Sequence, residues 1–109
     1  MSIYLLNSPI LTDWGTYKFR EINIQEARFY LMHGIESYIS AIGHSGTAEV
    51  LSKLLGFEVP ANRIAVKMET GDKAVVFKLL DRLPEGTVLN ADELSKLKYT
   101  FGILEKVAD

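Results

Sequence analysis

The hydrophobic residues of this 109-residue chain follow two spacings, and each spacing predicts a different kind of element. Residues 2–8 form a short, nearly continuous apolar run, which is typical of a strand buried on both faces. Residues 15–22 alternate aromatic and charged side chains, so they predict a half-exposed strand. Residues 99–107 predict a strand that closes the fold.

Helical spacing of apolar residues predicts three helices. The first spans residues 23–32, with an asparagine as its N-cap and Phe29 among its apolar side chains. The second spans residues 45–55, and Gly56 is suited to be its C-cap. A third, short helix is predicted over residues 91–98.

The strongest local signal predicts a β-hairpin over residues 62–80. Two β-branched runs flank residues 69–72, where a glycine can supply the positive φ that a tight loop needs. Residues 37–42 predict one more short strand. The order of these elements predicts an α/β (α+β-like) single domain over residues 1–109, with a mixed sheet of about five strands flanked by helices.

Composition and charge then limit the function. The chain has no cysteine and two histidines, which excludes thiolate chemistry and a histidine-rich metal cage within one subunit, so we expect neither metal nor cofactor. A net charge of −2 argues against binding to long nucleic acid but not against a small anionic ligand held by a few arginines.

The expected setting is the cytoplasm. No apolar run approaches the length that spans a bilayer, and the first residues lack the basic start of a signal peptide, so we expect no membrane partner. Domains of this size often bury spare apolar surface in a second copy, so a homodimer is expected.

His44 lies where the second helix is predicted to begin, and histidine titrates near neutral pH. Gly43 and Gly46 allow a ligand close to the backbone, while Ser45 and Thr47 add hydroxyl groups at a helix start suited to phosphate. The alternative is that Ser45 is only an N-cap and that His44 is a turn residue. Chemistry alone leaves both open.

Further candidate residues lie at the ends of predicted strands. Arg82 and Glu85 follow the predicted hairpin, and arginine can make planar, bidentate contact to phosphate. Arg63 and Lys78 lie on the cationic faces of the two hairpin arms. For a single arginine–glutamate pair, a surface ion pair that fixes a turn is the commoner outcome, and a solvated sheet face explains the lysine equally well.

Asn7 and Ser8 follow the first buried strand, a position where α/β domains often bind ligands. These residues could also simply shape a turn. Tyr38 is the one tyrosine retained as a candidate for stacking on a base.

Three blocks of sequence, IYLLNSPIL, SAIGHSGTAEVLSKLLG and NRIAVKM…GDKAVVFKLLDRLPEGTVL, resemble the viral ring nuclease family. These are small type III anti-CRISPR proteins of archaeal viruses and phages, with relatives in bacteria. The resemblance implies a homodimer that binds cyclic tetra-adenylate across its twofold axis. It also implies metal-independent cleavage of that ring to linear products with a 2′,3′-cyclic phosphate, which switches off type III CRISPR signalling.

The resemblance also assigns residues. The family's histidine matches His44, which is the implied general acid, and its arginine–glutamate pair matches Arg82 and Glu85 around the scissile phosphate. A further arginine that contacts the ring matches Arg63, and the asparagine after the first strand matches Asn7.

Two positions depart from the family pattern. Ile10 replaces a serine of the site, so that Ser8 is the nearest hydroxyl, and Lys78 replaces a glutamine and adds positive charge. The loss of the serine keeps an alternative open, in which the protein binds and sequesters the cyclic nucleotide, or regulates, with little turnover. A third reading is a structural or host-interaction protein.

Overall fold

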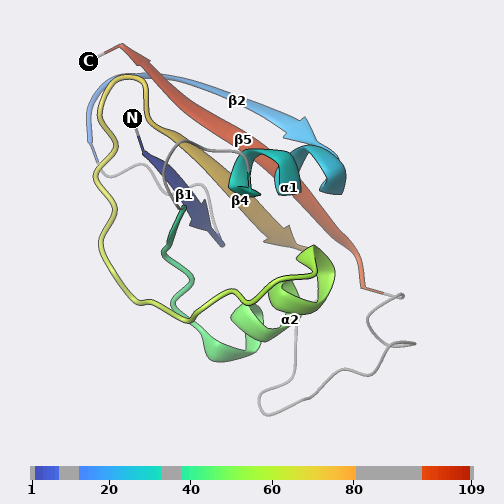
Figure 1. Ribbon diagram of the computed structural model, residues 1–109. Helices are drawn as coiled ribbons and strands as arrows, with labels where there is room; N and C mark the ends of the chain where they lie inside the picture. Colours follow the sequence, from blue (N-terminus) through green and yellow to red (C-terminus); the bar gives the residue numbers. More distant parts are fainter. Residues whose placement is uncertain (1, 8–12, 33–37, 81–96, 109) are drawn as a thin grey trace.

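The computed structural model describes residues 2–7, 13–32, 38–80 and 97–108. Its elements follow one another as β1 (Ile3–Leu6), β2 (Thr16–Ile22), α1 (Ile24–Met32), β3 (Ile39–Ser40), α2 (Ser45–Leu55), β4 (Lys73–Leu79) and β5 (Tyr99–Ala108). The strands form a single five-stranded sheet in the order β2-β5-β4-β1-β3 (Figure 1). The predicted fold class, a mixed sheet of about five strands with helices, is confirmed.

The sheet has a parallel part and an antiparallel part. β1 pairs in parallel with both β3 and β4, whereas β5 is antiparallel to β4 and to β2. Because β3, β1 and β4 run in the same direction, their carboxyl ends meet along one edge of the sheet. We call these three strand ends, and the residues that directly follow them, the carboxyl edge.

Strand alternation gives the sheet two apolar faces. One face carries both helices, and its core joins Leu5, Val75 and Phe77 of the sheet to residues of α1 and α2. The helical residues in this cluster are Ala27, Leu31, Ala48, Val50, Leu51 and Leu55. The opposite face holds a smaller cluster that includes Leu6 and Val76.

Helix α1 begins with reciprocal capping. The Asn23 carbonyl Oδ1 accepts a hydrogen bond from the Glu26 N–H at 2.8 Å, and Glu26 Oε1 accepts one from the Asn23 N–H at 3.3 Å. Ala27 and Leu31, one turn apart, are buried in the core. The prediction that Phe29 joins this apolar side is wrong, because it lies two residues from each of them, on the other side of the helix, and is 61% exposed.

The hairpin predicted over residues 62–80 is wrong in its first arm. Its second arm forms β4, but residues 62–68 form no strand. The reason is that β1 and β5 already occupy both edges of β4, which leaves no ladder for the first arm. Residues 60–69, which we call the covering segment, instead lead from α2 towards β4 as irregular chain (Figure 1). Met68 joins the apolar cluster on the face opposite the helices.

The predicted loop at residues 69–72 does form, and it is fixed to β5. Gly71 has the positive φ of 96° that favours glycine, and the Asp72 N–H donates to the Glu69 carbonyl at 2.9 Å. The Gly71 N–H donates to the Lys106 carbonyl at 2.8 Å. The buried Lys106 side chain donates to the Met68 carbonyl at 3.2 Å, so the end of the covering segment is held against β5.

Two predictions of shorter elements have mixed outcomes. The strand predicted over 37–42 is reduced to the two residues of β3. Leu97 and Lys98 are not helical, and the rest of the helix predicted over 91–98 lies outside the described residues. In the part of the chain that the structure describes, no helix has the length and apolar character needed to cross a bilayer.

The Asp72→Ala variant is expected to lose about 1–3 kcal/mol of unfolding free energy, measured by urea denaturation. The buried Asp72 carboxylate accepts hydrogen bonds from the Ser2 N–H at 2.8 Å and the Glu69 N–H at 2.9 Å, and alanine leaves both donors without this partner. The control is Glu49→Ala, which removes an exposed ion pair to Lys53 and should change stability by no more than about 0.5 kcal/mol. Equal losses in the two variants would contradict a structural role for Asp72.

Candidate functional site

The carboxyl edge gathers candidate residues from three strands. Asn7 directly follows β1 and is half-buried, and residues 41–44 lead from β3 into α2. Lys78 lies near the end of β4, two residues beyond Val76, the partner of Leu6 in the ladder. Open α/β sheets bind ligands in the crevice outside the carboxyl ends of their strands, so the topology brings these candidates to a favourable place.

His44 occupies the N-cap position of α2. It has extended backbone angles, φ −126° and ψ 128°, and its carbonyl accepts the first intrahelical hydrogen bond, from the Ala48 N–H at 3.0 Å. Its side chain is exposed and makes no capping hydrogen bond. The alternative in which Ser45 is the N-cap is therefore wrong, because Ser45 is the first helical residue.

The first turn of α2 has the features of an anion site. The N–H groups of Ser45, Gly46 and Thr47 precede the first intrahelical bond, and the positive end of the helix dipole lies here. A Cβ built on Gly46 meets nothing within 4 Å, so the space beside it is open. A phosphate could approach these backbone groups directly.

Arg63 lies against the residue that precedes His44. A Cβ built on Gly43 would be 3.5 Å from Arg63 Cγ, so the arginine stem packs over this glycine. Arg63 remains exposed, which leaves its guanidinium available to an anion. The structure therefore brings Arg63 against Gly43, the neighbour of His44, although the two lie far apart in the sequence.

Lys78 lies on the other face of the same edge. Phe77 is fully buried under the helices, so alternation turns Lys78 to the opposite face, where it is exposed. It shares the carboxyl edge with His44, but α2 begins on the helical face. A ligand that contacts both residues has to reach around the end of β4.

The remaining predictions separate into two groups. Ser8, Arg82 and Glu85, together with Ile10, lie outside the described residues. Tyr38 precedes β3 and therefore lies at the end of that strand away from His44. Burial raises the pKa of the Tyr38 hydroxyl, the carboxylate of Glu58 raises it further, and the hydroxyl donates to the Glu58 carbonyl at 3.3 Å.

Two residues that the sequence did not single out connect the covering segment to β3. The Ser40 hydroxyl donates to the Pro60 carbonyl at 2.7 Å, and Asn62 Nδ2 donates to the Ser40 carbonyl at 2.8 Å. The Asn62 N–H also donates to the Ile42 carbonyl at 2.8 Å. No periodic or local pattern marks these residues, because their partners lie about 20 positions away.

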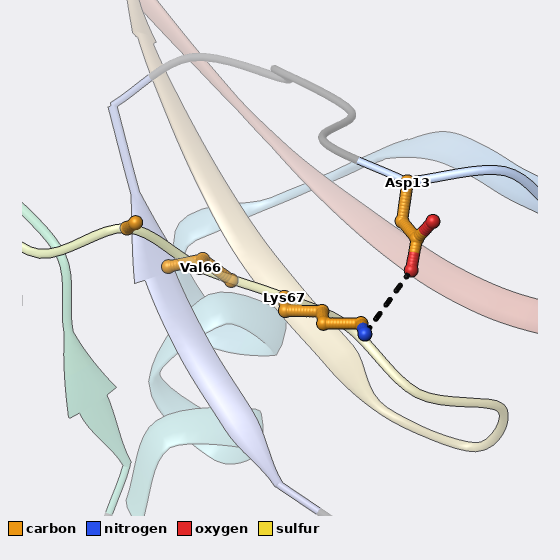
Figure 2. A pocket seen from close by; sticks show the side chains of 4 residues that line it. Asp13, Val66 and Lys67 are labelled. Carbon is orange, nitrogen blue, oxygen red and sulfur yellow. Dashed lines mark ion pairs between the residues drawn. The ribbon is translucent and has the colours of Figure 1, made fainter.

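A separate pocket lies along the covering segment. Its lining includes Asp13, Ala65, Val66 and Lys67, and its volume is about 320 Å³. Figure 2 shows the side chains of Asp13, Val66 and Lys67 around it. Lys67 Nζ is 3.8 Å from Asp13 Oδ2, and this lysine side chain is largely exposed. Among the described residues, no predicted site residue lines this pocket, so we do not assign the candidate chemistry to it.

The chain is similar to known proteins over nearly its whole length. A family model described as STIV B116-like matches residues 3–101. Over 107 residues the chain is 37% identical to the uncharacterized protein YddF of Bacillus subtilis (strain 168). The alignment covers 98% of this chain and 99% of that protein. Over 109 residues it is 34% identical to the uncharacterized protein ORF117 of Acidianus two-tailed virus, covering 96% and 93%.

A solved structure shares the fold. B116 of Sulfolobus turreted icosahedral virus matches with a TM-score of 0.84 and 27% sequence identity, covering 96% of this chain and 99% of that chain. The relatives thus come from a bacterium and from viruses, and the match includes nearly the whole chain.

The His44→Ser variant is expected to be more stable than the wild type by roughly 0.5–1 kcal/mol in urea denaturation. His44 holds the N-cap geometry without a side-chain bond, whereas a serine hydroxyl accepts from the N–H of the second or third helical residue. His44→Ala is the control, because it removes the imidazole without supplying an acceptor and should bring no such gain. A loss of stability in His44→Ser would show that the imidazole contributes to folding.

Proposed function

The chain belongs to the STIV B116-like family, and we propose that this member is a metal-independent ring nuclease that cleaves cyclic tetra-adenylate. The observation that carries the proposal is the arrangement at the start of α2. An exposed histidine, a set of open backbone N–H groups and the stem of Arg63 lie together there. The resemblance of the sequence blocks to viral ring nucleases supports the same assignment.

The proposed chemistry needs few groups. The ribose 2′-hydroxyl loses its proton to solvent water as its oxygen attacks the adjacent phosphorus, the bond to the 5′-oxygen breaks, and the product carries a 2′,3′-cyclic phosphate. The protein contributes by holding the 2′-hydroxyl in line with the leaving oxygen, which can account for a large part of the acceleration. His44 in its protonated form donates a proton to the leaving 5′-oxygen.

Positive charge in this mechanism balances the charge that develops on the phosphate. Backbone N–H groups at the start of α2 and the guanidinium of Arg63 contact the phosphate oxygens of the ring. From the resemblance, Arg82 stabilises the charge of the transition state and Glu85 lies beside it. Asn7 and Lys78 contact the ring from the ends of β1 and β4.

The proposed active unit is a homodimer in the cytoplasm, which is that of the host cell if the protein is viral. A ring of four identical nucleotides has twofold symmetry, so a twofold dimer presents the same residues to opposite phosphates of the ring. Destroying this messenger would switch off type III CRISPR signalling.

Incubation of the protein with radiolabelled cyclic tetra-adenylate in EDTA is expected to give linear products that end in a 2′,3′-cyclic phosphate. His44→Ala should reduce the rate by at least about 100-fold, because a positioned general acid typically contributes that much or more. The matched control is alanine at the other histidine, His33, which has no assigned role and should leave the rate unchanged.

The same experiment separates the alternatives. Tight binding of an intact ring by the wild type would contradict cleavage and favour the sequestering alternative. If the wild type neither binds nor cleaves the ring, both proposals fail. Loss of cleavage when EDTA is present, with recovery when Mg²⁺ is added, would contradict the metal-independent mechanism.

Lys78→Gln is expected to weaken ring binding several-fold at low salt and to reduce the slope of log K against log salt by about 0.7. The measurement uses a His44→Ala background, so that the ring stays intact during titration. Lys18→Gln is the matched control, because it removes the same charge from β2, at the far end of the sheet. Equal changes in both variants would mean that net charge alone, rather than contact at the carboxyl edge, determines affinity.

A further inference from the structure

The covering segment begins with a set of hydrogen bonds to β3 and to the nearby Ile42, which we call the clamp. Asn62 makes two of these bonds. The Asn62 side chain donates to the Ser40 carbonyl at 2.8 Å, and the Asn62 backbone N–H donates to the Ile42 carbonyl at 2.8 Å. A third bond, from the Ser40 hydroxyl to the Pro60 carbonyl at 2.7 Å, holds the chain two residues earlier. Three hydrogen bonds therefore fix residues 60–62 relative to β3 and the chain that directly follows it.

The partners of this clamp belong to the core. Ser40 is 4% exposed and Ile42 is fully buried, so their carbonyl groups have little access to water. Leaving a buried carbonyl without its hydrogen bond is costly, which favours the closed clamp. The backbone of Asn62 is thus held more firmly than the exposure of its side chain would suggest.

The clamp ends where the candidate site begins. Arg63 is the next residue after Asn62 on one side, and Gly43 is the next residue after Ile42 on the other. A Cβ built on Gly43 would be 3.5 Å from Arg63 Cγ, so the stem of Arg63 lies beside Gly43 directly after the clamp. An arginine on an irregular segment would otherwise have to be ordered when a ligand binds, at the expense of affinity.

We propose that Asn62 is a positioning residue, which holds Arg63 beside the start of α2 so that its guanidinium meets a phosphate bound there. This inference rests on the proposed function, because it names the ring phosphate as the partner of Arg63. Asn62 itself does not touch the ligand. We therefore expect Asn62 to change the affinity for the ring only by holding Arg63 in place.

A double-mutant cycle tests this dependence. Asn62→Ala, Arg63→Ala and the double variant are made in the His44→Ala background, and the Kd for cyclic tetra-adenylate is measured for each. We expect Arg63→Ala to weaken binding by about tenfold or more, as is typical for loss of a charge-assisted hydrogen bond. Asn62→Ala should weaken it several-fold, and the double variant should bind no more weakly than Arg63→Ala. Effects that multiply, or an unchanged Kd in Asn62→Ala, would overturn the proposal.

Ser52→Ala is the matched control for general loosening of the chain. The Ser52 hydroxyl accepts a hydrogen bond from the Val59 N–H at 2.8 Å, just before the covering segment, and lies in α2 away from Arg63. This variant also removes the hydrogen bond that the Ser52 hydroxyl donates to the Ala48 carbonyl at 2.8 Å, so its urea stability should fall by at least as much as that of Asn62→Ala, while its Kd for the ring stays at the reference value. A loss of affinity equal to that of Asn62→Ala would show that the effect is structural only.

A second readout does not depend on the ligand. The backbone order parameter of Arg63, measured by ¹⁵N relaxation, should fall in Asn62→Ala and stay at the wild-type value in Ser52→Ala. An unchanged order parameter in Asn62→Ala would overturn the positioning role, whether or not the ring is cleaved. Failure of the wild type to cleave the ring, by contrast, contradicts the proposed function and leaves this readout to decide the role of Asn62.

Discussion

The parallel pairing of β1 with both β3 and β4 is the constraint on which the candidate site depends. Parallel strands cannot be joined by a tight turn, so each connection between them must leave the sheet at one end and return at the other. The connection from β3 to β4 therefore begins at the carboxyl edge, and α2 is its first element. His44 and the open N–H groups lie at this edge because the crossover has to start there.

The N-terminus of α2 lacks the side-chain capping hydrogen bond that helices commonly have. Helix α1 uses reciprocal capping by Asn23 and Glu26, but α2 has a histidine at its N-cap that forms no capping bond. Sequences usually agree with their local structure, and departures without a compensating contact are concentrated at functional sites. The contrast between the two helices of the described chain supports a role for His44 in binding or chemistry rather than in folding.

The sequence predicted those elements whose formation is decided locally. The strands β1, β2 and β5 and the helices α1 and α2 follow from periodicity and caps, with boundaries close to those observed. The hairpin failed because pairing depends on which strand edges are free, and both edges of β4 are taken by strands distant in sequence.

The same limit applies to the site. His44 was recognisable as a residue at a helix start, and Arg63 entered through alternation and family resemblance. Their proximity, and the part of Asn62 in it, depend on hydrogen bonds between residues 20 and 22 positions apart, which leave no local signal. Arg82, Glu85 and Ser8 stay predictions from the sequence.

The covering segment connects the candidate site to the rest of the domain. One end is attached to β3 through Asn62, and the other is attached to β5 through the buried Lys106 and to the turn through Asp72. Between these attachments, Met68 contributes to the cluster opposite the helices. A segment that forms no strand is thus fixed at both ends by buried or partly buried hydrogen bonds, and Arg63 lies near the start of α2 without being part of a strand. The geometry of the candidate site therefore depends on the packing of the face opposite the helices as well as on α2 itself.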